Sequence, residues 1–217
     1  MSLTLALTVA WLRASAVVVA DNEQLLTDLD AAIGDADHGN NLRRGMDAVV
    51  DQLDREAAST IGGVLHAAGM TLISSVGGAS GVLYGTLLLR MASAIGDRDE
   101  VPAPEVAAAL RAGLEGVRSR GHAELGDKTM VDVLAPAIDA LDAAVAAGAS
   151  LADAVSLAAI AAQAARDATA PLVARKGRAS YLGERSAGHV DPGAASIALL
   201  LGALAEALAA PSMAENR

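Results

Sequence analysis

Residues 194–209 read AASIALLLGALAEALA, and this stretch shows how the whole chain is built. Apolar side chains make up 53% of the 217 residues, but phenylalanine is absent and aromatic residues reach only 1%. The apolar content is therefore mostly alanine, leucine and valine. Alanine and leucine lose little on entering a helix, and small side chains let helices approach closely. A strand-rich protein would use more tyrosine, phenylalanine, isoleucine and threonine, so we predict an all-α fold.

Similar helical segments recur along the chain, separated by short polar or glycine-rich breaks. Besides 194–209, we predict helices at about residues 3–20, 21–33, 42–56, 59–75, 82–95, 105–119, 130–147 and 151–168. The pattern predicts no strand and contains no sequence repeat. Because short connections favour antiparallel neighbours, these eight or nine helices indicate an up-and-down bundle that forms one domain over residues 1–217.

Composition and charge exclude several classes of function. The formal net charge is −10, from 26 acidic and 16 basic residues, which argues against broad binding to a nucleic-acid backbone. Cysteine is absent, so disulfides, zinc thiolates and thiol nucleophiles are excluded. The N-terminus lacks the pattern of a signal peptide. The most apolar late segment, 194–210, carries Glu206 and falls short of a membrane span, so we expect a soluble, cytoplasmic protein without a membrane partner.

Three aspartates near the end of the second predicted helix form the first candidate site. Asp30 lies one turn before the helix end, and Asp35 and Asp37 alternate in the loop beyond it. This spacing can turn the carboxylates toward one side, and oxygen ligands without histidine or cysteine suit Mg²⁺. Each aspartate alone is better explained as a turn cap or a solvated residue. Three of them beside two glycines favour a metal site.

Two glycine-containing segments could hold phosphate. Residues 38–41, His-Gly-Asn-Asn, open a helix, and helix N-termini offer free N–H groups and the positive end of a dipole. They lack the lysine and the Ser/Thr of a Walker A motif. Residues 77–81, Gly-Gly-Ala-Ser-Gly, can form an anion nest to which Ser80 adds a hydroxyl. By itself, the second segment is better explained as a tight turn between packed helices.

Two further segments are polar and rich in glycine. Gly126-Asp127-Lys128-Thr129 is adequately explained as an ordinary capped helix start. Residues 175–193 form an unusually long loop with five glycines, in which Arg178 could contact phosphate. This loop could be a mobile lid that excludes water, and a disordered surface connection explains it equally well.

Together and in this order, the four loops resemble the nucleotide-binding L subunit of dihydroxyacetone kinase, or the equivalent C-terminal domain of single-chain dihydroxyacetone kinases. The resemblance spans nearly the whole chain and is carried by Leu29-Asp30, Gly34 to Gly39, Ser75 to Gly81, Gly126 to Met130, Gly177 to Tyr181, and Asp191 to Ala194. It implies an eight-helix antiparallel barrel-like bundle with ADP or ATP held on its rim.

The resemblance also implies the residues of the site. Asp30, Asp35 and Asp37 would bind two Mg²⁺ ions that bridge the phosphates. The nucleotide would contact His38, Gly39, Asn40, Asn41, Ala79, Ser80, Gly121, Met130, Arg178, Asp191, Pro192 and Gly193. No catalytic residue is expected on this chain.

In the family that the chain resembles, two or three proteins share the reaction. A partner K subunit holds dihydroxyacetone covalently on its own histidine and supplies the acid–base groups, while this chain would supply the phosphoryl donor and the metals. In versions linked to the phosphotransferase system, a phosphohistidine-bearing M subunit recharges the bound nucleotide, and Asp37-His38-Gly39 looks like that version. Two alternatives stay open. One is an ATP-dependent kinase subunit for a related ketose such as a tetrulose, and the other is a non-catalytic helical interaction module.

Overall fold

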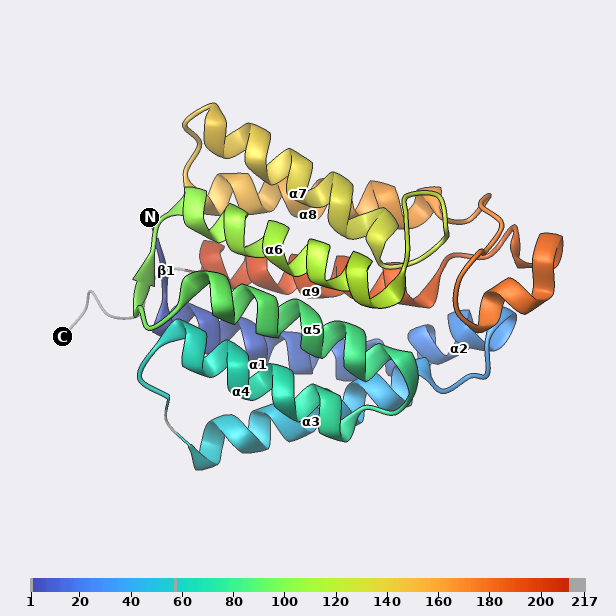
Figure 1. Cartoon of the computed structure of the whole chain (residues 1–217), viewed down its shortest axis with the longest axis horizontal. Coiled ribbons are helices and arrows are strands. Elements are labelled where there is room, and N and C mark those ends of the chain that lie inside the picture. Colours follow the sequence, from blue (N-terminus) through green and yellow to red (C-terminus); the bar gives the residue numbers. More distant parts are fainter. Residues whose placement is uncertain (1, 57, 211–217) are drawn as a thin grey trace.

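The computed structural model describes residues 2–56 and 58–210 and is an all-α protein, which confirms the predicted fold class (Figure 1). Its α-helices are α1 (Leu5–Asp21), α2 (Glu23–Ile33), α3 (His38–Arg55), α4 (Ile61–Ser75), α5 (Gly78–Ile95), α6 (Ala103–Gly121), α7 (Val131–Ala146), α8 (Leu151–Ala168) and α9 (Pro192–Ala209). A 3-10 helix, η1 (Arg178–Ser186), lies between α8 and α9.

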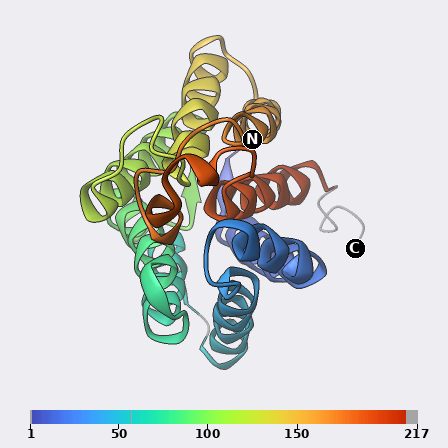
Figure 2. The same ribbon diagram turned by 90° about the vertical axis from the view of Figure 1, so that its right-hand side faces the viewer.

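Eight of these helices follow one another round a ring. α1 packs on α3, each later helix packs on its successor, and α9 packs back on α1. Seen end on, the helices surround a common centre (Figure 2). The remaining helix, α2, continues α1 after a bend of 63°. When this bent pair is counted as one helix, the total equals the eight helices that the resemblance implied.

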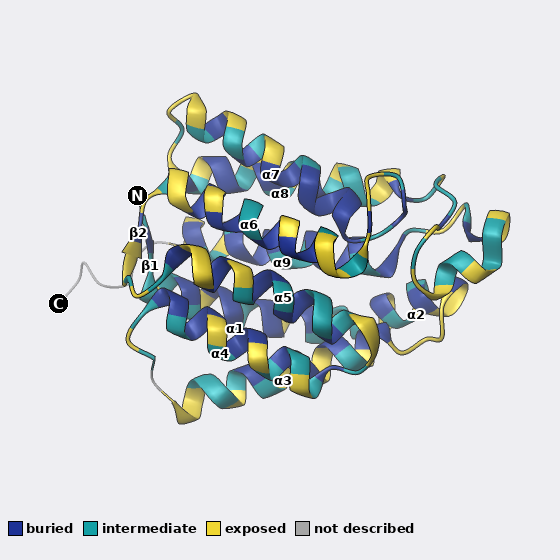
Figure 3. Cartoon of the chain, viewed as in Figure 1, coloured by how far each residue is buried: buried dark blue, intermediate teal, exposed yellow. Residues whose placement is uncertain are grey.

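The small side chains of the sequence allow the helices to approach closely. At the contact between α4 and α5, a Cβ atom added to Gly85 would lie 2.6 Å from the carbonyl oxygen of Gly69. At the contact between α5 and α6, a Cβ atom on Gly113 would lie 2.6 Å from Leu87. Residues on the inner faces of the helices are mostly buried, and those on the outer faces are mostly exposed (Figure 3). Alanine and glycine therefore set the spacing of the ring, and leucine and valine fill it.

The structure corrects three details of the prediction. Two helices start earlier than predicted: α3 begins at His38, not near residue 42, and α5 begins at Gly78, not near residue 82. The absence of strands was wrong, because β1 (Leu3–Thr4) pairs with β2 (Glu100–Val101) in a short antiparallel sheet. The long loop before α9 is neither structureless nor a simple connection, since it contains η1.

The expectation that residues 194–210 fall short of a membrane span is also corrected. By length and composition, α5 and α9 could each cross a membrane, and α1 with α2 could do so only as a bent pair. A single charge such as Glu206 does not lower the mean hydropathy of α9 enough to exclude it. In this fold, 44% of the α5 window and 56% of the α9 window are buried inside the protein.

The alternation of helix direction brings the N-termini of α3, α5, α7 and α9 to the same end of the bundle, on the right in Figure 1. η1 and α2 lie at this end as well and contact each other. Helix N-termini present free N–H groups and partial positive charge. This end of the ring is therefore suited to bind anions.

Candidate functional site

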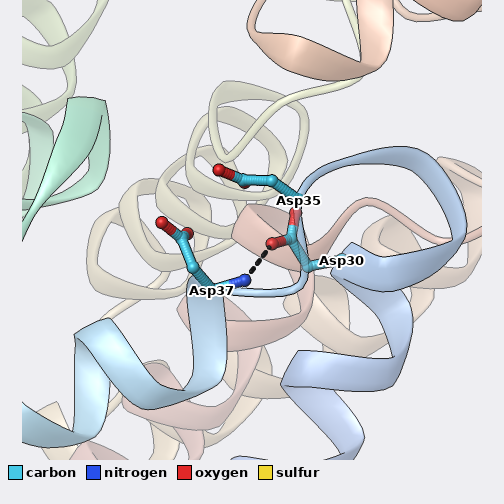
Figure 4. Close-up of side chains that lie close together, drawn as sticks. All are labelled: Asp30, Asp35 and Asp37. Carbon is cyan, nitrogen blue, oxygen red and sulfur yellow. Dashed lines mark hydrogen bonds between the residues drawn. The ribbon is translucent and has the colours of Figure 1, made fainter.

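The three predicted aspartates lie together at the end of the bundle where the N-termini of α3, α5, α7 and α9 gather. One carboxylate oxygen from each of Asp30, Asp35 and Asp37 lies within 4.8 Å of the others (Figure 4). Asp30 is buried, and its Oδ2 accepts hydrogen bonds from the backbone N–H groups of Asp37 (2.9 Å) and His38 (3.2 Å). The aspartate of α2 thus fixes the loop that carries the other two.

The turn between α2 and α3 depends on Gly34. A Cβ atom at this position would lie 2.0 Å from Oδ1 of Asp30 and 3.0 Å from its carbonyl oxygen. Only a residue without a side chain lets the Asp30 carboxylate keep its place. The backbone of Ala36 adopts the left-handed conformation (φ 62°), which turns the chain so that Asp35 and Asp37 lie on the same side.

The cluster has the donors that Mg²⁺ prefers. All three ligands are carboxylate oxygens, and Mg²⁺ binds few such groups together with waters and phosphate oxygens at about 2.1 Å. Opposite ligands of one such ion are about 4.2 Å apart, close to the 4.8 Å within which these oxygens lie. Within the described part of the chain, no other group of three histidine or acidic residues is arranged in this way. The residues present therefore fit magnesium.

A cavity of about 570 Å³ opens beside the cluster. The N-terminal ends of α3, α5 and α9 contribute to its wall, together with the loop that leads into α7. Its lining includes four aspartates and four basic residues, namely Asp30, Asp35, Asp37, Asp191, Arg120, Lys128, Lys176 and Arg178. The balanced charges suit a ligand that is itself an anion carrying a cation.

His38 connects three of the helices that surround the cavity. Its Nε2 lies 2.9 Å from Ser196 Oγ on α9, and its Nδ1 lies 3.4 Å from Ser80 Oγ on α5. Tyr84 of α5 also hydrogen-bonds Ser196 through its hydroxyl. Burial lowers the pKa of His38, although the nearby Asp30 and Asp37 carboxylates oppose this shift. Burial raises the pKa of Tyr84.

Asp191, which lines the cavity, forms the N-cap of α9. Its Oδ2 accepts a hydrogen bond from the backbone N–H of Ala194 (2.7 Å). Burial raises the pKa of Asp191 to about 7, and this hydrogen bond opposes the shift. The next residues, Pro192 and Gly193, begin α9 and line the cavity.

Residues 170–190, which we call the strap, connect α8 to α9, and residues 176–179 of the strap line the cavity. The strap carries Arg178, whose Nε lies 3.0 Å from Oδ2 of Asp35. Both side chains are accessible to solvent, so this ion pair contributes little to stability by itself. Its importance is geometric, because it places a guanidinium beside the carboxylate cluster.

Most of the nucleotide-contacting residues that the resemblance implied line this one cavity. They are His38, Ala79, Ser80, Gly121, Met130, Arg178, Asp191, Pro192 and Gly193. The other three do not line it. A Cβ atom on Gly39 would lie 2.2 Å from the carbonyl oxygen of Glu23, so this glycine serves the packing of α3 on α2. Asn40 is exposed, and Asn41 accepts a hydrogen bond from Arg44.

Four polar residues of the cavity were not assigned from the sequence: Arg120, Lys128, Thr129 and Lys176. Lys128 and Thr129 belong to a segment that was explained as an ordinary helix start. A helix does start here, at Val131, but its N-cap residue is Met130, whose side chain makes no capping hydrogen bond. Lys128, however, is buried, with a left-handed backbone (φ 63°). The sequence did contain a signal for this residue, because Lys128, between Asp127 and Thr129, is one of only two lysines in the chain.

The family model of the DAK2 domain matches residues 32–206 of this chain. Two bacterial relatives match it over almost their whole length. The "PEP-dependent dihydroxyacetone kinase, ADP-binding subunit DhaL" of Escherichia coli (strain K12) is 45% identical over 94% of this chain and 98% of the relative. The subunit of the same description from dihydroxyacetone kinase 1 of Listeria innocua is 44% identical over 89% of this chain and 92% of the relative.

A solved structure shows the same fold. The dihydroxyacetone kinase from C. freundii in complex with AMP-PNP and Mg²⁺ superimposes with a TM-score of 0.72 at 28% identity. The match covers 95% of this chain but only 34% of the C. freundii chain. The chain thus spans about a third of the length of that kinase.

Proposed function

The chain belongs to the DAK2 domain family, and from this premise we propose that it is the nucleotide-binding subunit of a dihydroxyacetone kinase. Its role is to hold ADP or ATP with two Mg²⁺ ions and to present the phosphoryl group for transfer. The 45% identity over 98% of the E. coli ADP-binding subunit supports this role.

One observation carries the proposal. Three carboxylates converge beside a cavity that is surrounded by helix N-termini, so ligands for a hard cation and ligands for phosphate face the same space. Bound magnesium would neutralise part of the negative charge of the phosphates. A solvated acidic loop of an interaction module would need neither the buried Asp30 nor the cavity.

The residues of the chain divide the remaining work. The N–H groups at the starts of α5 and α9 would bind phosphate oxygens, because helix N-termini favour anions. Ser80 would add a hydroxyl donor, and Arg178 would contact the phosphates from the strap. Gly121 and Met130, with the apolar wall near Leu83, would enclose the nucleoside. Catalysis by this chain would then consist of positioning and charge neutralisation.

The acceptor and the phosphoryl source are proposed to lie on other proteins. A K subunit would hold dihydroxyacetone covalently on a histidine, and a phosphohistidine-bearing M subunit would recharge the bound ADP. The description of the E. coli and Listeria relatives as PEP-dependent supports this version over an ATP-consuming one. We expect the protein to work in the cytoplasm, without nucleic acid or membrane.

Thermal unfolding tests the proposal. With Mg·ADP at 100 times its dissociation constant, ligand binding should raise the free energy of unfolding by about 2.7 kcal/mol. For a chain of this length, that corresponds to a rise in Tm of about 5–10 °C. The rise should disappear when EDTA removes magnesium and in the Asp35→Ala variant. ADP that remains bound through desalting would support recharging by a partner, and freely exchanging ADP would support ATP-dependent transfer.

Asp28→Ala is the matched control. Asp28 lies on α2 like Asp30, but it is exposed and does not line the cavity. The variant should therefore keep the full Mg·ADP effect. If Mg·ADP raises the Tm of Asp35→Ala as much as that of the parent protein, the metal site is wrongly assigned.

A further inference from the structure

The ammonium group of Lys128 lies inside the protein in a cage of backbone carbonyl oxygens. Lys128 is only 1% exposed. Its Nζ donates to the carbonyl oxygens of Thr169 (2.9 Å), Ala170 (3.2 Å), Leu172 (3.0 Å) and His189. An ammonium group has three N–H donors, so four acceptors leave none for a ligand. Lys128 therefore lines the cavity with the aliphatic part of its side chain, while its ammonium group donates to backbone carbonyl oxygens next to and within the strap.

One of these carbonyl groups belongs to Thr169, just before the strap, and the others belong to the first residues of the strap (Ala170 and Leu172) and to its last residues (His189). The two ends of the strap therefore meet at the Lys128 ammonium group. The backbone N–H of Gly188 donates to Ala170 O (2.7 Å), and that of Asp191 donates to Thr169 Oγ1 (3.0 Å). Lys128 bonds to the same region from the loop that leads into α7. The Lys128 side chain thus joins the end of α8, both ends of the strap and the loop that leads into α7.

The outer part of the strap depends on this junction for its position. η1 packs on α2, and Arg178 reaches Asp35 from the first turn of η1. Both of these contacts are at the exposed tip of the strap. Nearer its base, the strap is held by the carbonyl cage, by the bond from Ala174 N to Ser186 Oγ, and by a bond from Arg175 N to the carbonyl oxygen of Asp127 (3.0 Å), the residue before Lys128. A change at Lys128 would disturb this base and so move Arg178 relative to the aspartate cluster.

The choice of lysine here stands out against the rest of the chain. Only two of the 16 basic residues are lysines, Lys128 and Lys176, and both line the cavity. Elsewhere the chain uses arginine. A compact ammonium with three rotatable donors can sit among converging carbonyl oxygens, whereas a planar guanidinium cannot. The cage accounts for lysine at position 128.

We propose that Lys128 is a positioning residue that fixes the strap, and through it Arg178, against the metal–nucleotide complex. It is not a phosphate ligand, although it lies in the cavity wall. This inference rests on the proposed function of the site.

A double-mutant cycle tests it, with the dissociation constant of Mg·ADP measured by calorimetry. Lys128→Met removes the ammonium while keeping a side chain of similar length. Lys128→Met and Arg178→Ala should each weaken binding about tenfold, and the double variant should be only about tenfold weaker than the parent. If Lys128 bound the nucleotide directly or acted independently of the strap, the losses would multiply to about a hundredfold, and the proposal would be overturned.

Thr8→Val separates positioning from general stability. Thr8 is fully buried and donates to Thr4 O at the opposite end of the bundle, so the variant should lower the Tm without changing the dissociation constant. If Lys128→Met does not fold, Ser186→Ala replaces it, because Ser186 Oγ accepts from Ala174 N (2.8 Å) at the strap junction outside the cavity. It too should weaken binding in a way that is not additive with Arg178→Ala.

The two proposals fail in different ways. If the parent protein does not bind Mg·ADP, the proposed function is wrong. If the parent binds Mg·ADP and the folded strap variants bind it equally well, the role of Lys128 alone is refuted.

Discussion

Replacement of Gly34 by alanine should destroy the carboxylate cluster without removing any of its ligands. The new Cβ atom would lie 2.0 Å from Asp30 Oδ1 and 2.9 Å from its Cγ, so the carboxylate must move. It cannot move freely, because Oδ2 is held by the N–H groups of Asp37 and His38. The substitution therefore either breaks these two hydrogen bonds or displaces the turn.

The size of the effect follows from the bonds that are lost. A hydrogen bond to a charged group contributes about 1.5–3 kcal/mol. Two such bonds at the lower value give about 3 kcal/mol of lost unfolding free energy. For a chain of about 200 residues, 1 kcal/mol shifts the Tm by about 2–4 °C, so Gly34→Ala should melt about 6–12 °C below the parent. The added stabilisation by Mg·ADP should be lost as well.

Gly202→Ala provides a matched control for Gly34→Ala. Gly202 lies within α9, and a Cβ atom there would meet nothing within 4 Å. Alanine in a helix interior is favoured over glycine by about 0.5–1 kcal/mol, so this variant should be slightly more stable than the parent. Scanning calorimetry with and without Mg·ADP measures both variants. A Gly34→Ala protein with the Tm and the Mg·ADP response of the parent would refute the role assigned to the turn.

Two further predictions concern Asp191 and Tyr84, which both line the cavity. Burial raises the pKa of Asp191 from 3.8 to about 7. Between these two pH values the folded protein keeps a proton on Asp191 that the unfolded chain releases. Asp191 therefore makes the free energy of unfolding fall as the pH rises from about 4 to about 7. Asp191→Asn should therefore gain about 2 kcal/mol relative to the parent between about pH 5 and pH 7, at about 1.4 kcal/mol per pH unit; urea unfolding at both pH values checks this, and a constant difference contradicts it. Tyr84→Phe removes the hydroxyl bonded to Ser196 and should cost about 1 kcal/mol; a loss below about 0.3 kcal/mol in urea unfolding would show that this bond is not a net contributor.

The helices could be predicted from the sequence because their signals are local. Alanine-rich and leucine-rich segments between glycine breaks predict helices whatever their neighbours are. α3 and α5 were the exceptions, since each begins about four residues before its predicted start, with His-Gly-Asn-Asn and Gly-Ala-Ser-Gly as poor helical first turns. The first turn of α3 is stabilised by Asp30, eight residues before His38, because the Asp30 carboxylate accepts the His38 N–H. A cap supplied from the preceding helix leaves no local pattern.

The cavity could be predicted only in part, for a similar reason. The aspartates and glycine loops were visible as motifs, and they lie together. The strap was visible as a long glycine-rich loop, but its anchoring was not, because Lys128 lies more than forty residues away from its partners Ala170 and Leu172. Sequence alone also left open whether it was a lid or a disordered connection. The structure shows that the carbonyl cage ties both ends of this segment to the loop that leads into α7.

The architecture explains why a cation and an anion should bind here together. The antiparallel ring brings helix N-termini to one end, and these favour phosphate. The same space contains three carboxylates, which repel phosphate unless a cation lies between them. Free ADP is therefore opposed by the aspartates, and Mg²⁺ alone lacks the oxygens that complete its coordination. Because each ligand removes the penalty on the other, magnesium and nucleotide must raise each other's affinity by the same factor.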